Sequence, residues 1–475
     1  MLTQIANEDS RLSFWLRVRE FAVPPSMIET ATARRRTGDW AGACAAGGID
    51  LDLDLRSLAR THGRELAARV RADLRHLAPD LLRWHMPRIA PDGLLRPALT
   101  ITLARYGAAG PESGDLLHLV VRTPPAWADG GQRFSLALWD PARPDAGAPR
   151  HPHHRPHRRF RLDLHRHLWD ARRSGELAFR AGTGRLPADA PFLPVHQPPE
   201  PPPPLSPHHR WAVDRWEDEA RRVLHAEGRT AGAVAVRLGS RRRLVVEVTG
   251  EADGKGASAS RITPPTDGGG TRLLPVLPDA ATWVSPDVEL LDAGLIGAGG
   301  LHPLVAAALV PGHRVSGPHL PQGRTGRPRV VDCRGTTHRI GLVGGVLTAL
   351  DHDPDEIRRE ELLVALTGTP LPCLQVIDRA HRRPESLADV RARLDHGDTV
   401  GALAVVEDLL GPGAVLRDGP LRDELEAAAQ RRIAYGLFRA GLAGPAPGRV
   451  PPRDRLPALR PRPRAGRPDP RHTTR

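Results

Sequence analysis

The amino-acid sequence predicts an α+β protein with two folded domains, on three observations. Apolar residues recur every three or four positions between His62 and His85, which is typical of an amphipathic helix. Between Leu99 and Leu164 the pattern changes to an alternation of apolar and polar residues, which indicates strands. In the middle of the chain, ten of the 21 residues from Pro187 to Pro207 are proline, which predicts a stiff polyproline spacer.

The expected first domain, residues 1–184, is a helical segment packed on an antiparallel sheet. Ser26 and Glu29 have the spacing of a capping box and predict a helix to about Arg36, followed by a short helix over 40–46. The helix over 62–85 is expected to break or kink at Pro79. Four runs predict the sheet: 99–104, 116–122, 133–138 and 159–164. Residues 49–55 alternate Asp and Leu, which fits either a further strand or a loop.

A linker over 185–207 is expected to lead into a second α+β domain, residues 208–443. Its predicted elements are a helix over 211–227, a hairpin of 233–238 with 244–249, a helix starting at Ser285-Pro286-Asp287, and strands 330–333, 339–343 and 346–350. The part from 354 to 443 is predicted to be nearly all helix, in the segments 354–366, 374–382, 386–394, 399–410 and 421–442. Residues 444–475 are rich in Pro and Arg and are expected to be a disordered tail.

One short pattern occurs twice. Gly38-Asp39-x-x-Gly42-Ala43 near the start matches Gly397-Asp398-x-x-Gly401-Ala402 near the end, each between two predicted helices. This is the pattern of a turn inside a helical hairpin, so we expect the same hairpin geometry at both places.

Charge and cysteine content limit the class of protein. The formal net charge is +13, and Lys255 is the only lysine among 68 basic residues, as GC-rich codon usage produces. Residues 444–475 hold nine Arg and two Asp, so the rest of the chain is only mildly basic. Cys44, Cys333 and Cys373 form no CxxC pair, which favours a reducing compartment over a disulfide scaffold or zinc finger. With no secretory signal at the N-terminus and no apolar run long enough for a bilayer, we expect a cytoplasmic protein without membrane association.

The best candidate for an active centre is Asp351-His352-Asp353, with His338 and Cys333 upstream. Carboxylate and imidazole groups on adjacent strands suit a metal hydrolase or a general base, which makes His338, Asp351 and His352 the candidate catalytic residues. Asp353 has a simpler interpretation, because it stands where a helix N-cap is expected before Pro354. Cys373 stands at a predicted helix start, where a thiolate would be stabilised, but a buried structural cysteine is the favoured interpretation.

Two further clusters contain residue types that can bind metal ions. Six histidines lie between His151 and His167: His151, His153, His154, His157, His165 and His167. Prolines and arginines interleave them, so a surface loop is favoured over a metal site. Asp50, Asp52 and Asp54 resemble the first ligands of a calcium loop, but Leu55 and Thr61 stand where that loop needs Gly and Glu. No Walker A, GxSxG or HExxH motif is present, and no metal or cofactor is expected.

Two stretches resemble an uncharacterised protein family of GC-rich actinobacteria: FWLRVREFAVPPS (14–26) and ELLVALTGTPLPC (361–373). The resemblance covers most of residues 1–443 and implies no activity. It does imply an association with MoxR-type AAA+ ATPases and von Willebrand A proteins, with this chain as a non-catalytic component.

Three functions follow as hypotheses. The first is a cytoplasmic interaction or adaptor protein whose helical C-terminal region docks a protein partner, such as the AAA+ ATPase that the resemblance implies. The second is a metal-dependent or acid/base hydrolase centred on His338, Asp351 and His352. The third is nonspecific, salt-dependent binding of nucleic acid or another polyanion by the arginine-rich tail.

Deletion of residues 444–475 is expected to leave the melting temperature nearly unchanged. The segment offers only Val450, Leu456 and Leu459 as large aliphatic residues, too few to offset an ordering cost of roughly 1–2 kcal/mol per residue. The deletion should also weaken retention on heparin. A drop of several degrees in the melting temperature of the truncated chain would show that the tail packs against a domain.

Overall fold

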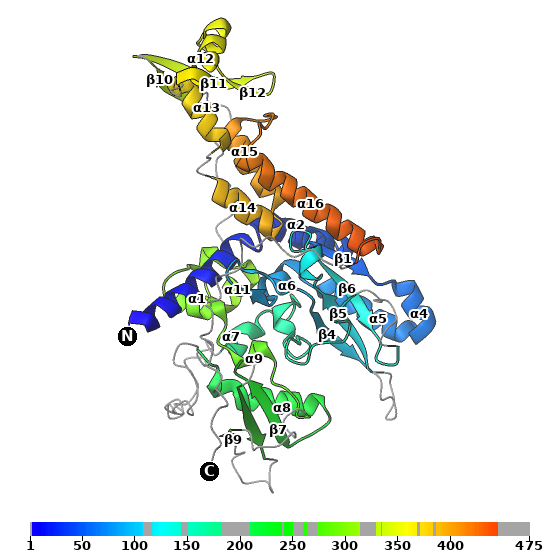
Figure 1. Cartoon of the computed structure of the whole chain (residues 1–475). Helices are drawn as coiled ribbons and strands as arrows, with labels where there is room; N and C mark the ends of the chain where they lie inside the picture. The colour runs from blue at the N-terminus through cyan, green and yellow to red at the C-terminus, as the bar shows by residue number, and fades with distance from the viewer. Residues whose placement is uncertain are drawn as a thin grey trace, which may run out of the picture.

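The computed structural model describes residues 2–107, 116–143, 151–181, 210–239, 242–249, 260–264, 273–313, 329–333, 335–367, 371–382 and 386–444. The fold is α+β, as predicted: several small sheets, mostly antiparallel, are separated and covered by helices (Figure 1). None of the helices in these ranges combines the length and apolar character that crossing a bilayer requires. The predicted linker, 185–207, and nearly all of the predicted tail lie outside the described residues.

Six helices precede the central sheet: α1 (Leu2–Phe21), α2 (Pro25–Arg36), α3 (Trp40–Ala46), α4 (Leu55–His62), α5 (Arg64–His76) and α6 (Pro79–His85). The sequence analysis did not predict α1. It placed the end of α2 correctly, but the capping box does not form, because Pro24 is the N-cap and Ser26 lies inside the helix. The expected break at Pro79 is confirmed: α5 ends at His76 and Pro79 is the first residue of α6.

The largest sheet has the strand order β1 (Ile49–Asp52), β6 (Phe134–Trp139), β5 (Leu117–Arg122) and β4 (Thr100–Tyr106). All its pairs are antiparallel except β1 with β6. The predicted strand over 159–164 is wrong, and β1 takes the fourth place in the sheet. Leu162 donates one backbone hydrogen bond to Thr102 of β4 but forms no ladder. Phe160 and Leu162 are buried nevertheless, and this accounts for the alternating pattern.

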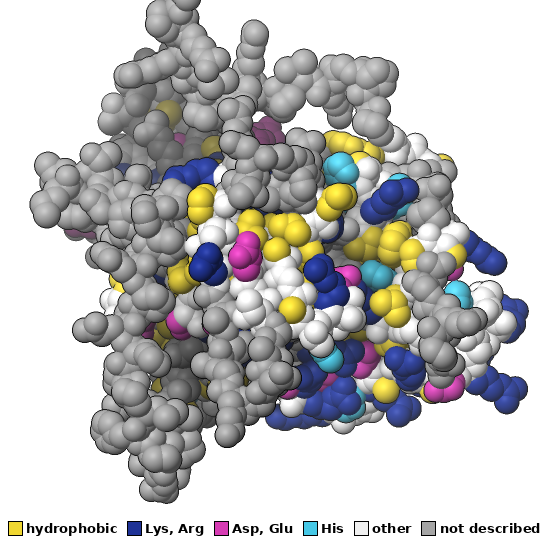
Figure 2. Space-filling model, turned by 90° about the horizontal axis from the view of Figure 1, so that it is seen from below, with side chains coloured by type: hydrophobic (Ala, Val, Ile, Leu, Met, Phe, Trp, Pro, Cys, Tyr) yellow, Lys and Arg dark blue, Asp and Glu magenta, His cyan; other side chains and the backbone are white. Residues whose placement is uncertain are grey.

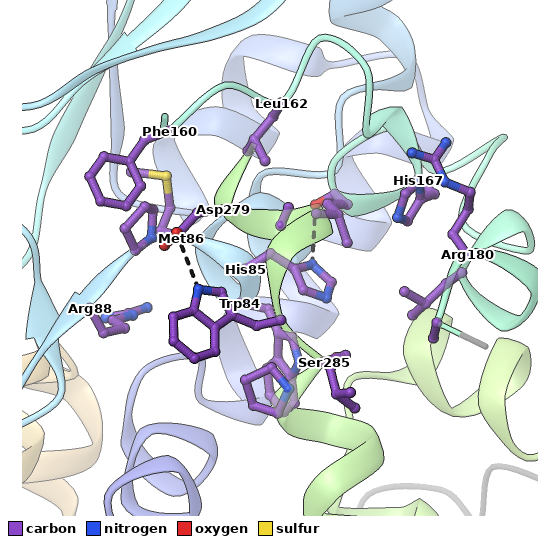
Figure 3. A pocket seen from close by; sticks show the side chains of 18 of the residues that line it. Trp84, His85, Met86, Arg88, Phe160, Leu162, His167, Arg180, Asp279 and Ser285 are labelled. Carbon is purple, nitrogen blue, oxygen red and sulfur yellow. Dashed lines mark hydrogen bonds between the residues drawn. The ribbon is translucent and has the colours of Figure 1, made fainter. Parts of the chain in front are cut away.

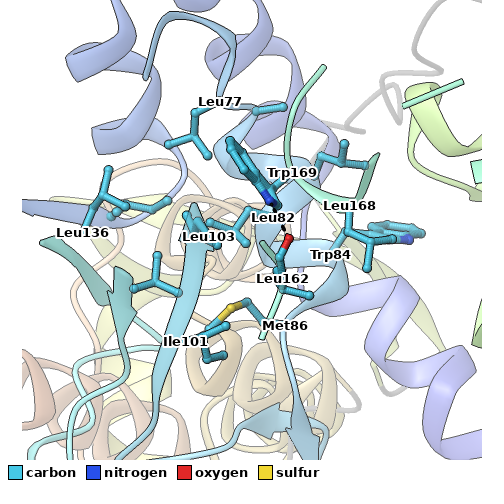
Figure 4. Close-up of a cluster of buried hydrophobic side chains, with 14 of the residues drawn as sticks. Leu77, Leu82, Trp84, Met86, Ile101, Leu103, Leu136, Leu162, Leu168 and Trp169 are labelled. Carbon is cyan, nitrogen blue, oxygen red and sulfur yellow. Dashed lines mark hydrogen bonds between the residues drawn. The ribbon is translucent and has the colours of Figure 1, made fainter. Parts of the chain in front are cut away.

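The core beneath this sheet joins helices and strands of the first half of the chain (Figure 4). Trp169 is fully buried in it, between residues of α6 and β4 such as Leu82 and Leu103. Val288 of α10 (Pro286–Asp292) and Val305 of α11 (Pro303–Leu309) belong to the same core. Residues beyond the linker therefore contribute to the first core. The predicted boundaries at 184 and 208 remain a prediction.

Two smaller units follow. One is the sheet β7 (Gly232–Arg237), β8 (Arg243–Val248) and β9 (Ser260–Thr263), packed on α8 (Trp216–Ala226). The other is the sheet β10 (Arg329–Cys333), β11 (Thr336–Val343) and β12 (Val346–Ala349), whose core includes residues of α13 (Pro372–Arg382), α14 (Leu387–His396), α15 (Thr399–Leu410) and α16 (Pro420–Ala440). The predicted positions of these strands and helices are confirmed except for β9, which was not predicted. The longer helix α12 (Pro354–Thr367) lies where a helix over 354–366 was predicted. Further short elements are β2 (Arg88–Ile89), β3 (Leu94–Leu95), α7 (Glu176–Arg180) and α9 (Asp279–Thr282).

The two matching sequence patterns form the same turn. Gly38 and Gly397 have φ of +79° and +86°, the left-handed region in which glycine is favoured. Asp39 and Asp398 then cap the next helix, each accepting a hydrogen bond from the backbone N–H three residues on, at 2.8 and 2.9 Å. The prediction of a shared helical-hairpin geometry is confirmed.

The C-terminal helices return to the first sheet (Figure 1). On α16, the Tyr435 hydroxyl donates to Asp50 and the Arg439 guanidinium pairs with Asp52, so the acidic side of β1 holds this helix. Asp54 caps α4 by accepting from the backbone N–H groups of Arg56 and Ser57. Each of the three aspartates that resembled calcium ligands thus has a protein partner.

Candidate functional site

The described residues offer two candidate sites. One is a pocket beside the first core, and the other is a cluster of cysteine and histidine side chains at the sheet of β10, β11 and β12. The pocket, which we call the arginine pocket, has a volume of about 370 Å³. It lies between α1, residues 84–88, strand β4, and the segments 159–168 and 279–286 (Figure 3). These segments are far apart in the sequence, and only the fold brings them together.

Arginine dominates the lining of this pocket: Arg11, Arg19, Arg88, Arg96, Arg159, Arg161, Arg180 and Arg215. Five of them pair with carboxylates, in the pairs Arg11–Glu289, Arg19–Asp287, Arg159–Asp279, Arg161–Asp163 and Arg180–Glu219. Among the described residues that line the pocket, Asp279 alone is acidic. The pocket therefore carries an excess of positive charge.

This excess comes from Arg88, Arg96 and Arg215, which form no ion pair with a carboxylate among the described residues, although the charges of Asp214 and Glu219 raise the pKa of Arg215 against the effect of its burial. Arg88 is buried and donates to the carbonyls of Arg83 and Gly93 at 2.7 and 3.3 Å, while its Nε has no partner among the described residues. Burial lowers the pKa of Arg88 well below its ordinary value, and the nearby Arg83 and Arg19 lower it further. An anion in the pocket would offset this unfavourable charge.

Arg96 and Arg215 are held more loosely. The Arg96 guanidinium is exposed and lies 5.4 Å from the ring centroid of Phe160. Arg215 donates one hydrogen bond, of 3.3 Å, to the carbonyl of Trp283. Both side chains can therefore turn toward a ligand without breaking an ion pair.

The rest of the lining is largely apolar and aromatic, including Trp15, Trp84, Met86, Ile101, Phe160, Leu162 and Trp283. Trp283 is stacked on Trp211 with ring centroids 3.9 Å apart. Such a wall suits the body of an aromatic ligand, while the arginines suit its charged part.

His167 also lines the pocket, and the sequence analysis placed it in a surface loop. That expectation is wrong for His165 and His167, which are 2% and 3% exposed. His165 Nε2 lies 3.2 Å from Glu219, whereas His167 Nδ1 has no partner among the described residues. Burial and the neighbouring His165 and Arg180 lower the pKa of His167 well below its ordinary value. Basic side chains are also prominent on the described surface that Figure 2 shows from below. Because arginine is abundant outside the pocket too, its abundance in the sequence could not reveal the pocket.

The second candidate is the cysteine–histidine cluster, which consists of Cys333, His338, His352 and Cys373. One potential ligand atom from each residue lies within 4.8 Å of all the others. Cys333 ends β10, His338 lies on β11, His352 follows β12 and Cys373 is in the first turn of α13. The structure thus brings together two of the three predicted catalytic residues, His338 and His352, whose ring centroids are 4.0 Å apart.

Asp351, the third predicted catalytic residue, is engaged elsewhere. Its carboxylate accepts hydrogen bonds from the backbone N–H and the guanidinium of Arg339, at 2.7 Å each. These bonds lower the pKa of Asp351 to about 2. Asp353 accepts from the backbone N–H of Asp355 at 2.9 Å, as the predicted helix cap requires.

The two thiols of the cluster are fully buried. Burial, together with a hydrogen bond and the charge of Cys333, raises the pKa of Cys373 to about 11. A free thiol in this setting is protonated and unreactive, in agreement with the favoured interpretation of Cys373 as a buried structural residue.

No protein family, curated protein or solved structure was found that matches the chain. The resemblance to the actinobacterial family therefore remains a prediction, and the function is argued from the geometry of the two sites.

Proposed function

We propose that the protein is a non-catalytic binding protein whose arginine pocket takes a phosphorylated small molecule with an aromatic ring, a ligand of the nucleotide class. The observation that carries the proposal is the set of three pocket arginines, Arg88, Arg96 and Arg215, without a carboxylate partner in the described chain. Planar guanidinium groups bind phosphate oxygens in pairs of hydrogen bonds, and a phosphate dianion would neutralise most of the excess charge.

The rest of the pocket favours binding over catalysis. Asp279, the acidic residue of the lining, accepts from Arg159 at 2.6 Å and from Trp283 Nε1 at 3.2 Å, so it is poorly placed to accept a proton from a substrate. Phe160 and Trp283 add aromatic ring atoms to the wall, although Arg96 and Arg159 lie over the ring of Phe160 and Trp211 stacks on Trp283. A volume of about 370 Å³ lies in the range of small-molecule sites.

Titration of the full chain with ADP, followed by calorimetry, tests this function. ADP should bind, and adenosine, which lacks the phosphates, should bind at least tenfold more weakly. The double variant Arg96→Gln/Arg215→Gln should weaken ADP binding by roughly 100-fold or more, because it removes two hydrogen bonds to a charged group and each contributes about 1.5–3 kcal/mol.

The matched control is Arg358→Gln on α12, where the guanidinium is exposed and paired with Asp355. It should bind ADP as the natural chain does. The proposal is wrong if neither ADP nor inorganic pyrophosphate binds, or if the double variant binds them as tightly as the control.

A second candidate function is the adaptor role. On α16, Ile433 and Leu437 are 55% and 41% exposed, and their spacing of four residues places them on one side of the helix. An exposed apolar strip on the helical region supports docking of a protein partner, such as the AAA+ ATPase that the resemblance implies. A pull-down from the native host should recover a stoichiometric partner, and the double variant Ile433→Ser/Leu437→Ser should lose it. Recovery of no such partner counts against the adaptor role.

A further inference from the structure

The cysteine–histidine cluster has the composition and the spacing of a metal centre. Two thiol sulfurs and two imidazole nitrogens are the ligand set of structural zinc sites. Around one tetrahedral zinc, with bonds of about 2.3 Å to sulfur and 2.0–2.1 Å to nitrogen, the ligand atoms stand roughly 3.3–3.8 Å apart. The four atoms here lie within 4.8 Å of one another, so a small inward adjustment completes the tetrahedron.

The hydrogen bonds of His338 leave one particular ring nitrogen free for a metal. The Thr336 hydroxyl donates to the Cys333 carbonyl at 3.0 Å, so its oxygen accepts the proton of His338 Nε2, also at 3.0 Å. The lone pair of His338 is then on Nδ1, which is buried and without a hydrogen-bond partner among the described residues.

His352 is arranged in the same way. Its Nδ1 donates to the Glu356 carboxylate at 3.2 Å, which leaves the lone pair on Nε2. This nitrogen is also buried and without a hydrogen-bond partner in the described chain. Histidine ligands to zinc commonly donate the N–H of their other ring nitrogen to a carboxylate or another polar group. This hydrogen bond fixes the orientation of the ring and its tautomer.

From this geometry we propose that Cys333, His338, His352 and Cys373 bind one Zn²⁺ ion, and that the site is structural rather than catalytic. Four protein ligands fill the tetrahedron and leave no position for water or substrate. Asp351, which a hydrolase centred here would use, is bound to the backbone N–H and the guanidinium of Arg339 instead. Metal binding releases the two thiol protons to solvent, so both cysteines coordinate as thiolates.

The ligands come from four places in the chain, which indicates what the ion does for the fold. It fastens the sheet β10–β12 to the start of α13, in the unit that projects from the rest of the molecule (Figure 1). This unit has a small core, and a metal that binds only the folded form adds its binding free energy to folding.

The test is the metal content of the full, untagged chain, purified without chelators from cells grown with zinc and measured by inductively coupled plasma mass spectrometry. We expect one zinc per chain. The variants Cys333→Ser/Cys373→Ser and His338→Asn should each lose the bound zinc. Replacement of the zinc by Co²⁺ should give the visible absorption of a tetrahedral site with thiolate ligands.

Two matched controls separate the site from its surroundings. Cys44→Ser changes the third cysteine, which is buried in the first core, and His381→Asn changes a buried histidine on the same helix as Cys373. Both controls should keep one zinc per chain. The arginine-pocket variants should keep it as well, so a failure of the proposed function does not affect this test.

If the ligand variants fail to fold, the natural chain still decides the question. Removal of the metal by a chelator should make the region 329–382 sensitive to limited proteolysis while leaving residues of the first sheet protected, and added Zn²⁺ should reverse this. The proposal is overturned if the natural chain holds far less than one zinc per chain, or if Cys333 and Cys373 prove to be joined by a disulfide in freshly purified protein.

Discussion

Replacement of Arg83 by methionine should destabilise the protein more than any surface substitution. This side chain is 1% exposed and has no carboxylate partner among the described residues; it donates to three backbone carbonyls instead. Nε reaches Ala22 at 2.9 Å, Nη1 reaches Gln132 at 2.6 Å and Nη2 reaches His396 at 2.7 Å. Methionine fills similar space but donates no hydrogen bond, so three buried carbonyls lose their donor.

The expected loss is about 3 kcal/mol of unfolding free energy, since each carbonyl left without a partner costs about 1–3 kcal/mol. A part of this loss is offset, because burial lowers the pKa of Arg83 to about 10 and shows that the charge itself is unfavourable there. Urea denaturation followed by tryptophan fluorescence measures the difference. In the same experiment, Arg358→Met at an exposed position should change the free energy by less than about 0.5 kcal/mol.

The contact with His396 makes a second consequence measurable. His396 ends α14, so the Arg83 side chain ties the C-terminal helices to α6 and to the loop before β6. The backbones also approach closely there: a Cβ on Gly397 would lie 2.1 Å from the carbonyl oxygen of Gly131. Arg83→Met should therefore expose α14–α16 to proteolysis before the first sheet. Equal stability of this variant and Arg358→Met would show that the three hydrogen bonds contribute little.

Local signals in the sequence predicted local structure well. The two Gly-Asp turns were found because each needs a left-handed glycine followed by an aspartate cap, and both requirements are visible in six residues. The strand pairing was harder to predict. Residues 159–164 alternate as a strand does, yet they do not pair in the sheet, and β1 is the strand that pairs with β6. An alternating pattern indicates that every second side chain is buried. It does not indicate that the backbone pairs with a neighbouring strand.

The candidate sites were predicted only in part, for a related reason. His338 and His352 were chosen because they stand next to the ends of neighbouring predicted strands, whereas Cys373 is 21 residues beyond His352 and its approach depends on the packing of α13. Cysteines without a CxxC pair gave no zinc signal. The arginine pocket combines side chains from seven or more separate segments, and in a chain so rich in arginine none of them stood out.

Acidification from pH 7.5 to 5 should destabilise the protein by roughly 4 kcal/mol through two buried histidines. Burial lowers the pKa of both His85 and His396 to about 4. The charge of Arg19 lowers the pKa of His85 further, whereas the charge of Asp287 raises it. The charges of Arg88 and Arg83 lower the pKa of His396 further. In the unfolded chain the same groups titrate near pH 6.5. Between these values the unfolded state binds more protons, so stability is present above about pH 6.5 and is lost as the pH falls toward 4.

The variant His396→Asn isolates one of the two contributions. The asparagine amide can donate to the Ala392 carbonyl, as His396 Nδ1 does at 2.8 Å, but it takes up no proton. The difference in unfolding free energy between pH 7.5 and pH 5, measured by urea denaturation, should therefore shrink by about 2 kcal/mol, the contribution of His396. His225→Asn, the same substitution at an exposed position on α8, controls for the change of side chain. A pH dependence that is unchanged in His396→Asn would show that His396 binds its proton as readily in the folded protein as in the unfolded chain, and that its burial beside Arg83 and Arg88 does not disfavour the charge.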